Sequence, residues 1–152
     1  EYLKTQHNSQ VNNYRDWGIP LGRRFRALKL WFVIRNFGLS GLQQMIRKHI
    51  QLAQDFTNWI QEDEDYELLA PVPMNLVCFR YKPSNIHDEE RLNEINEKLL
   101  HSLNLSGKIY LTHTKLRGTY SLRMSIGQTR VEQQHIMEAW ELIQQTAKSL
   151  SQ

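Results

Sequence analysis

The sequence predicts an α+β domain, in which helices cover one face of an antiparallel sheet and two long helices lead into that sheet. Three observations predict it. Residues 66–150 follow the pattern β-β-α-β-β-α, and one stretch within them alternates strictly between apolar and polar residues. The length of 152 residues and the 40% of hydrophobic residues suit a single core.

The chain opens with a polar segment that leads into an unusually apolar helix. Residues 1–20 are predicted to be extended or mobile. The pattern from Leu21 to Phe37 is helical and apolar nearly all round, and Gly38 is a natural stop. Such a helix is normally buried on more than one side, and the rest of the chain is too short to bury it. The sequence therefore suggests that part of a larger protein is missing.

A second long helix follows, with Ser40 and Gln43 as a capping box and its end near the acidic residues 61–65. Two short strands are predicted next, in "YELLAP" and "NLVCFRY", separated by the turn at Pro71 and Pro73.

A third helix is predicted between a capping Asp88 and a terminating Gly107. The alternating stretch "KIYLTHTKLRGTYSLRMSIG" then predicts a hairpin around Gly118. Its alternation predicts one face with Ile109, Leu111 and His113 and another with Tyr120, Leu122, Met124 and Ile126. Thr129 and Glu132 are expected to start the last helix.

The charge pattern gives no sign of a dedicated nucleic-acid protein. The net charge of +3 is spread from Arg15 to Arg130 and interleaved with acids, whereas nucleic-acid domains usually concentrate it. The longest apolar run, Leu30–Ile34, is far shorter than the roughly 20 residues that span a bilayer. No signal peptide is apparent in the polar opening. We expect no nucleic-acid partner and no membrane span.

Cysteine and histidine give little indication of chemistry. The single cysteine, Cys78, has apolar neighbours, so we interpret it as a core residue of a protein in a reducing, cytoplasmic compartment. The six histidines and sixteen acids show no metal-ligand spacing, so no metal site is predicted. His113, inward on a predicted strand, is interpreted as a core or interface histidine rather than a catalytic base.

The run "GRRFR" is the most basic part of the chain. Gly22 leads into a helix start that could hold phosphates, with Arg23, Arg24 and Arg26 beside it. A positive helix start repels arginines unless an anionic group lies opposite. Pairing with partner protein is therefore the preferred interpretation, ahead of ligand binding and of an RNA-binding module, for which no RRM or KH signature is present.

The run "YRDWGIPLGRRFRALKLWFVIRNFG" closely resembles the segment that follows the cofactor lysine in group II pyridoxal-phosphate decarboxylases, the aromatic-L-amino-acid decarboxylase family. The resemblance continues in the family's order through "LQQMIRKHIQLAQDF", "LVCFR", "GKIYLTHTKLRGTYSLRMSIG" and "EAWELIQ". It covers nearly the whole chain.

This resemblance implies an α/β enzyme of fold-type I, the aspartate aminotransferase-like class, about three times longer than this chain. Residues 1–38 would be a mobile catalytic loop and the end of the large domain, and residues 39–152 the small C-terminal domain. The cofactor would be pyridoxal 5′-phosphate. The family's Schiff-base lysine follows a histidine, and no lysine here does so. That lysine would lie upstream of Glu1, and this chain alone is expected to be inactive.

The resemblance also implies site residues in a homodimer with a shared active site. Tyr2 matches a loop tyrosine that reprotonates the substrate α-carbon after carbon dioxide leaves, and a phenol can donate that proton if it is held close and dry. A phenylalanine at that position tends, in this family, to divert the reaction to oxidative products. Arg15, Leu21 and Gly22 match the active-site wall, where glycine leaves room for a larger ring than serine does.

The expected reaction is decarboxylation of an aromatic L-amino acid, such as dopa, tyrosine, tryptophan or 5-hydroxytryptophan, to the amine and carbon dioxide. Two alternatives stay open. One is a relative acting on histidine, glutamate or a diamino acid. The other is a non-enzymatic dimerisation or interaction domain, against which the exposed apolar helix argues.

Overall fold

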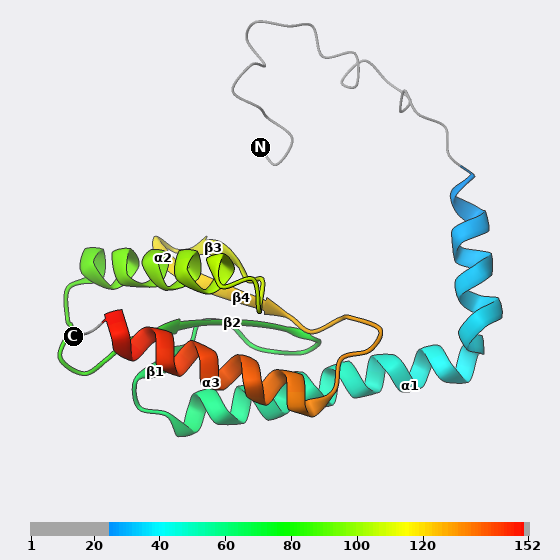
Figure 1. Ribbon diagram of the computed structural model, residues 1–152, viewed down its shortest axis with the longest axis horizontal. Coiled ribbons are helices and arrows are strands. Elements are labelled where there is room, and N and C mark those ends of the chain that lie inside the picture. The colour runs from blue at the N-terminus through cyan, green and yellow to red at the C-terminus, as the bar shows by residue number, and fades with distance from the viewer. Residues whose placement is uncertain (1–24, 151–152) are drawn as a thin grey trace, which may run out of the picture. The chain divides into compact units, whose positions relative to one another are not determined.

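The computed structural model describes residues 25–150, and their contacts divide the chain into two units between Leu39 and Ser40 (Figure 1). The helix α1 (Arg26–Glu62) runs across this division. Its backbone leaves helical geometry at Gly38, where φ is 66° and ψ is 176°. Glycine adopts a positive φ without the strain that a Cβ would impose. The predicted break at Gly38 is therefore confirmed, although helix resumes directly after it.

The second unit holds the sheet and the remaining helices. The strands β1 (Tyr66–Leu68) and β2 (Leu76–Tyr81) precede the helix α2 (Glu89–Leu105). The strands β3 (Thr112–Leu116) and β4 (Thr119–Ser125) precede the helix α3 (Gln133–Leu150). The strands form one antiparallel sheet in the order β1-β2-β4-β3. The predicted order of elements and the antiparallel sheet are confirmed.

The core lies where α1 and α3 meet one face of this sheet. Phe56 of α1 packs edge-on against Phe79 of β2, with ring centroids 5.4 Å apart, and against Trp140 of α3 at 5.6 Å. The Tyr66 ring lies 4.7 Å from Trp140. Aromatic pairs favour such tilted and edge-to-face arrangements. These contacts join the end of α1, the sheet and α3 into one core.

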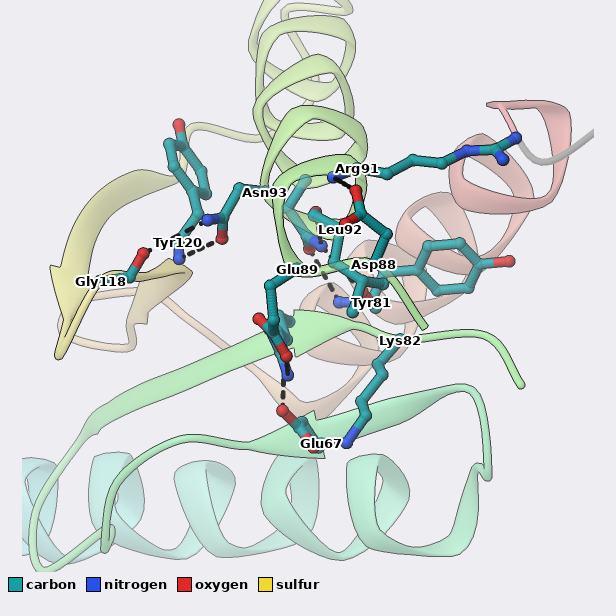
Figure 2. A network of polar contacts seen from close by, with 12 residues as sticks. Glu67, Tyr81, Lys82, Asp88, Glu89, Arg91, Leu92, Asn93, Gly118 and Tyr120 are labelled. Carbon is teal, nitrogen blue, oxygen red and sulfur yellow. Dashed lines mark hydrogen bonds and ion pairs between the residues drawn. The ribbon is translucent and has the colours of Figure 1, made fainter. Parts of the chain in front are cut away.

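Two asparagines of α2 fasten that helix to the sheet (Figure 2). Asn96 accepts a hydrogen bond from the Tyr81 main-chain nitrogen and donates to its carbonyl, each at 2.8 Å. Asn93 accepts one from the Tyr120 main-chain nitrogen at 2.7 Å. Asp88 caps the helix by accepting from the Arg91 main-chain nitrogen, as predicted. The α2 helix is thus hydrogen-bonded to both central strands.

The predicted hairpin is present, but the expected assignment of its faces is wrong. Arg117 and Gly118 both have positive φ, 52° and 90°, which is typical of a tight two-residue hairpin turn. His113 is paired with Leu122, and its ring stacks on that of Tyr120 at 4.9 Å. Residues opposite each other on neighbouring strands share a face. The two predicted faces are therefore one.

The last helix starts later than the capping box predicts. It begins at Gln133, so Thr129 and Glu132 lie before it. The Glu132 main-chain nitrogen donates instead to Nδ1 of His135, at 3.0 Å. A side-chain acceptor within the first turn satisfies an amide that the helix leaves unpaired. His135 therefore takes over the capping task that was assigned to Thr129.

Candidate functional site

The catalytic and wall residues that the resemblance implies lie outside the described residues. They are Tyr2, Arg15, Leu21 and Gly22, together with Arg23 and Arg24 of the basic run. The described part begins directly after them, at Phe25.

The first turns of α1 present an apolar surface that the other described residues leave exposed. Its large hydrophobic side chains between positions 25 and 34 are exposed by 41% at Val33 to 75% at Phe25. Trp31 and Phe32 are exposed by 54% and 57%, and their rings lie edge-to-face at 5.2 Å. Contiguous apolar surface of this kind marks a protein contact site. We name the segment of residues 25–37, in which α1 begins at Arg26, the docking helix.

Basic side chains accompany the apolar ones on the docking helix. Arg26, Lys29 and Arg35 are all exposed. The Arg35 guanidinium lies over the Trp31 ring, 5.7 Å from its centroid, where a cation is attracted by the ring face. Anionic groups of a covering surface would find partners here, which agrees with the predicted pairing to partner protein.

A buried arginine joins β1, β2 and α2. The Arg80 side chain is only 5% exposed and donates to Glu67 at 2.5 Å and to Glu89 at 2.7 Å. Figure 2 shows these two carboxylates pointing toward each other, one from β1 and one from the first turn of α2. Lys82 pairs with the second oxygen of Glu67 at 2.6 Å. The two carboxylates therefore neutralise the buried Arg80 guanidinium from two sides.

The ionisation of this cluster follows from its contacts. Burial lowers the pKa of Arg80, but the hydrogen bonds to Glu89 and Glu67 outweigh it and raise that pKa above its usual value. The hydrogen bond from Arg80 holds the pKa of Glu89 below its usual range. Both groups stay charged near neutrality. Because every oxygen and nitrogen involved already has a protein partner, we interpret the cluster as structural.

The loop between β4 and α3 is fastened to α1 by two contacts. Nε2 of buried His49 lies 3.1 Å from the Gln128 carbonyl, to which it donates. Lys48 forms an ion pair with Glu132 at 2.5 Å. His49 therefore has a structural partner in the loop before α3.

His113 and Cys78 can now be placed. His113 is exposed on the edge strand β3, so its interpretation as a core histidine is wrong, while the alternative of an interface histidine stays a prediction. One face of its ring stacks on the Tyr120 ring. Cys78 is buried and free, as predicted. Within residues 25–150 no group of histidine, cysteine and acidic side chains could hold a metal ion, and no helix is long and apolar enough to cross a membrane.

The described lysines do not fit a covalently bound aldehyde cofactor. Each is exposed or half-buried, and Lys48 and Lys82 are engaged in ion pairs. A lysine that forms a Schiff base usually lies in an enclosed pocket that lowers its pKa. Residues 25–150 therefore provide no attachment point for such a group.

Two grooves are formed on the second unit. One of about 1240 Å³ lies between residues 107–111, the end of β4 and α3. Its rim carries charges of both signs: Lys108, Arg130, Glu138 and Glu141. The other, of about 510 Å³, lies between the end of α1 and α3, and only acidic charges line it.

Comparison with known proteins identifies a family. The family model described as the pyridoxal-dependent decarboxylase conserved domain matches residues 1–82. The chain is 44% identical over 155 residues to tyrosine decarboxylase 4 of Petroselinum crispum, which covers 99% of this chain and 30% of the relative. It is 43% identical to phenylacetaldehyde synthase of a Rosa hybrid cultivar, over 97% of this chain and 30% of that relative.

A solved structure has the same fold. The crystal structure of Oryza sativa TDC with PLP and tryptamine matches with a TM-score of 0.79 and 36% sequence identity, over 93% of this chain and 30% of that one. The chain thus spans about a third or less of the length of the proteins it matches.

Proposed function

Because the chain belongs to the pyridoxal-dependent decarboxylase family, we propose that it is the C-terminal part of an enzyme that decarboxylates an aromatic L-amino acid to its amine and carbon dioxide. The observation that carries the proposal is the 44% identity to a tyrosine decarboxylase along 99% of the chain. Dopa, tyrosine, tryptophan and 5-hydroxytryptophan are the candidate substrates.

We propose pyridoxal 5′-phosphate as the cofactor. The matching family is defined by pyridoxal dependence, and a solved relative contains PLP. When bound, this cofactor provides an electron sink for the carbanion that forms as carbon dioxide leaves. By the resemblance, its Schiff-base lysine, which follows a histidine in the family, and its phosphate site would belong to sequence upstream of Glu1.

Tyr2 would act as the proton donor to the α-carbon, and Arg15, Leu21 and Gly22 would form the active-site wall. The phenol is the feature that favours amine formation over the aldehyde product named for the Rosa relative. Gly22 leaves space beside the substrate ring, which suits an indole and does not exclude a phenol.

The docking helix would pack against the rest of the polypeptide and its dimer partner. Support comes from its exposed Trp31 and Phe32 and from its uncovered arginines. A homodimer with a shared site, located in the cytoplasm, completes the proposal. The lone, buried Cys78 agrees with a reducing compartment.

The test uses the full-length protein loaded with cofactor. Tyrosine, dopa, tryptophan, histidine, glutamate and diaminobutyrate are offered separately, and amine and carbon dioxide are measured. Release of both from an aromatic substrate alone is expected. Turnover of histidine, glutamate or diaminobutyrate alone would support one of the other decarboxylases. No turnover of any substrate, with intact dimers, would favour the interaction domain.

Tyr2→Phe tests the proposed catalytic residue. The visible absorbance of the bound cofactor should stay unchanged, because the ring is kept, while amine production falls by about 100-fold or more with the lost proton donor. Unchanged amine production would refute the role of Tyr2. Tyr110→Phe, which removes the same hydroxyl from a side chain that is 80% exposed and has no proposed role, is the matched control.

A further inference from the structure

The groove between the end of α1 and α3 has two indole rings and only acidic charges. Figure 1 shows α3 running alongside the C-terminal part of α1. The lining residues from α1 and the turn after it are Trp59, Glu62, Asp63 and Glu64. Those from α3 are Met137, Trp140, Glu141 and Gln144. We name it the acid–indole groove. Its volume of about 510 Å³ lies within the usual range for small-molecule sites, roughly 300–1,000 Å³.

The walls of the acid–indole groove are held in place by the core. Trp140 is only 9% exposed, and its ring packs on Phe56 and Tyr66. Gln144 donates to Asp63 at 2.7 Å, which ties α3 to the turn after α1. A ligand would therefore meet a surface that is already formed, so little ordering would oppose its binding.

The charges of this groove are not compensated. Glu62, Glu64 and Glu141 form no ion pair with any described residue, although the chain has an excess of basic residues. The C-terminal end of a helix carries partial negative charge, which basic side chains usually offset, but the last turn of α1 has none. The larger groove has both basic and acidic side chains, so the excess of negative charge is particular to the acid–indole groove.

An acidic, aromatic groove recognises a particular kind of molecule. A cation is attracted both by carboxylates and by the face of an indole. Met137, 46% exposed, and half-buried Trp59 add apolar surface for a flat ring. The complementary ligand is a compact organic cation with an aromatic body. A basic peptide segment would share the charge, but this volume fits one ring and one ammonium group.

We propose that the acid–indole groove binds a protonated arylalkylamine, with its ring against Trp59 and its ammonium group among Glu62, Glu64 and Glu141. This inference rests on the proposed function, because that reaction releases such an amine. The groove would then be a second amine site, lined by Trp59 and by residues that follow it in the chain, none of which is proposed to act in the reaction.

The experiment counts tyramine bound to full-length holoenzyme by equilibrium dialysis at low ionic strength. We expect two classes of site per chain, one in the active site and one in the groove. Glu62→Gln combined with Glu141→Gln should weaken one class about fivefold, since each partly exposed charge contributes modestly. Glu94→Gln combined with Glu97→Gln on α2 removes the same charge elsewhere and should change neither class.

A second pair of measurements separates charge from stacking. Trp59→Leu should weaken the same class about threefold. The neutral alcohol analogue of tyramine should not occupy the groove. The proposal would be overturned by a single class of site, or by a second class whose affinity the double variant at Glu62 and Glu141 leaves unchanged. The first of these results would be expected if a basic segment of the protein covered the groove.

Decarboxylation is measured in parallel, so that the two proposals fail separately. Absence of groove binding in the unaltered holoenzyme, together with normal amine production, would overturn only the amine site. Tyramine binding that depends on Glu62 and Glu141, without any decarboxylation, would overturn the proposed function while leaving the groove a cation site.

Discussion

Replacing Asn96 by leucine tests how α2 is held on the sheet. The Asn96 side chain is fully buried and makes three hydrogen bonds of 2.8 Å: two with the Tyr81 main chain and one to the Leu92 carbonyl. Leucine keeps the volume but leaves these main-chain groups without the amide. Because an unsatisfied buried group costs about 1–3 kcal/mol, we expect the free energy of unfolding to fall by about 2–4 kcal/mol.

Urea unfolding of the 152-residue chain, followed by circular dichroism, measures this loss, and exchange of the Tyr81 amide reports it locally. A loss below about 0.5 kcal/mol with unchanged amide protection would refute the reasoning. Asn96→Asp separates hydrogen bonding from packing. The introduced carboxylate would face the Tyr81 and Leu92 carbonyls, which raises the pKa of this carboxyl group in the folded state. The variant should therefore be less destabilised as the pH falls and the carboxyl group becomes protonated. Asn93→Ala, at a half-buried position, should cost less.

Three further variants test the ion cluster, the hairpin turn and the last helix cap. Arg80→Met should lower the free energy of unfolding by about 1–2 kcal/mol at neutral pH. The lowered pKa of Glu89 stabilises the folded state, and this stability is lost as the pH falls below the ordinary value of 4.5. Without Arg80, the free energy of unfolding measured in urea should therefore fall less steeply with decreasing pH. An equally steep fall would contradict the role of the ion pair. Arg117→Asn, at positive φ, should raise stability by about 0.5 kcal/mol in thermal unfolding, and a decrease would count against the turn assignment. His135→Ala should cost about 1 kcal/mol and speed exchange of the Glu132 amide; unchanged exchange would show that the cap is unimportant.

The fold was predictable wherever local chemistry decides it. Gly38, Asp88 and Gly118 mark a break, a cap and a turn, and each does so for a backbone reason that acts within a few residues. The cap of α3 was not predictable in the same way. Thr129 fits a capping box as well as many helix starts do, but contacts of Lys48 and His49 fix the loop before the helix. Those contacts join residues about eighty positions apart.

The candidate sites show the same limit. Tyr2 and Gly22 were assigned from a resemblance, which no spacing rule could replace, and both lie outside the described residues. His113 was assigned inward because alternation gives two faces without saying which strand lies at an edge. The run of acids after Trp59 was visible in the sequence, but only the packing of α3 beside it makes a groove.

The docking helix connects these separate observations. Its seven large hydrophobic residues from Phe25 to Ile34 are all more than two-fifths exposed, while the second unit encloses its own core around Phe56. Burying half of each such side chain would contribute roughly 1 kcal/mol, or about 7 kcal/mol together, which is comparable to the stability of a whole domain. Another protein surface that covered these side chains would gain this free energy of burial, so we expect such a surface in the assembled enzyme. Gly22 lies four residues before α1, so under the proposed function the surface that covers the docking helix should also approach the wall that Gly22 is proposed to form.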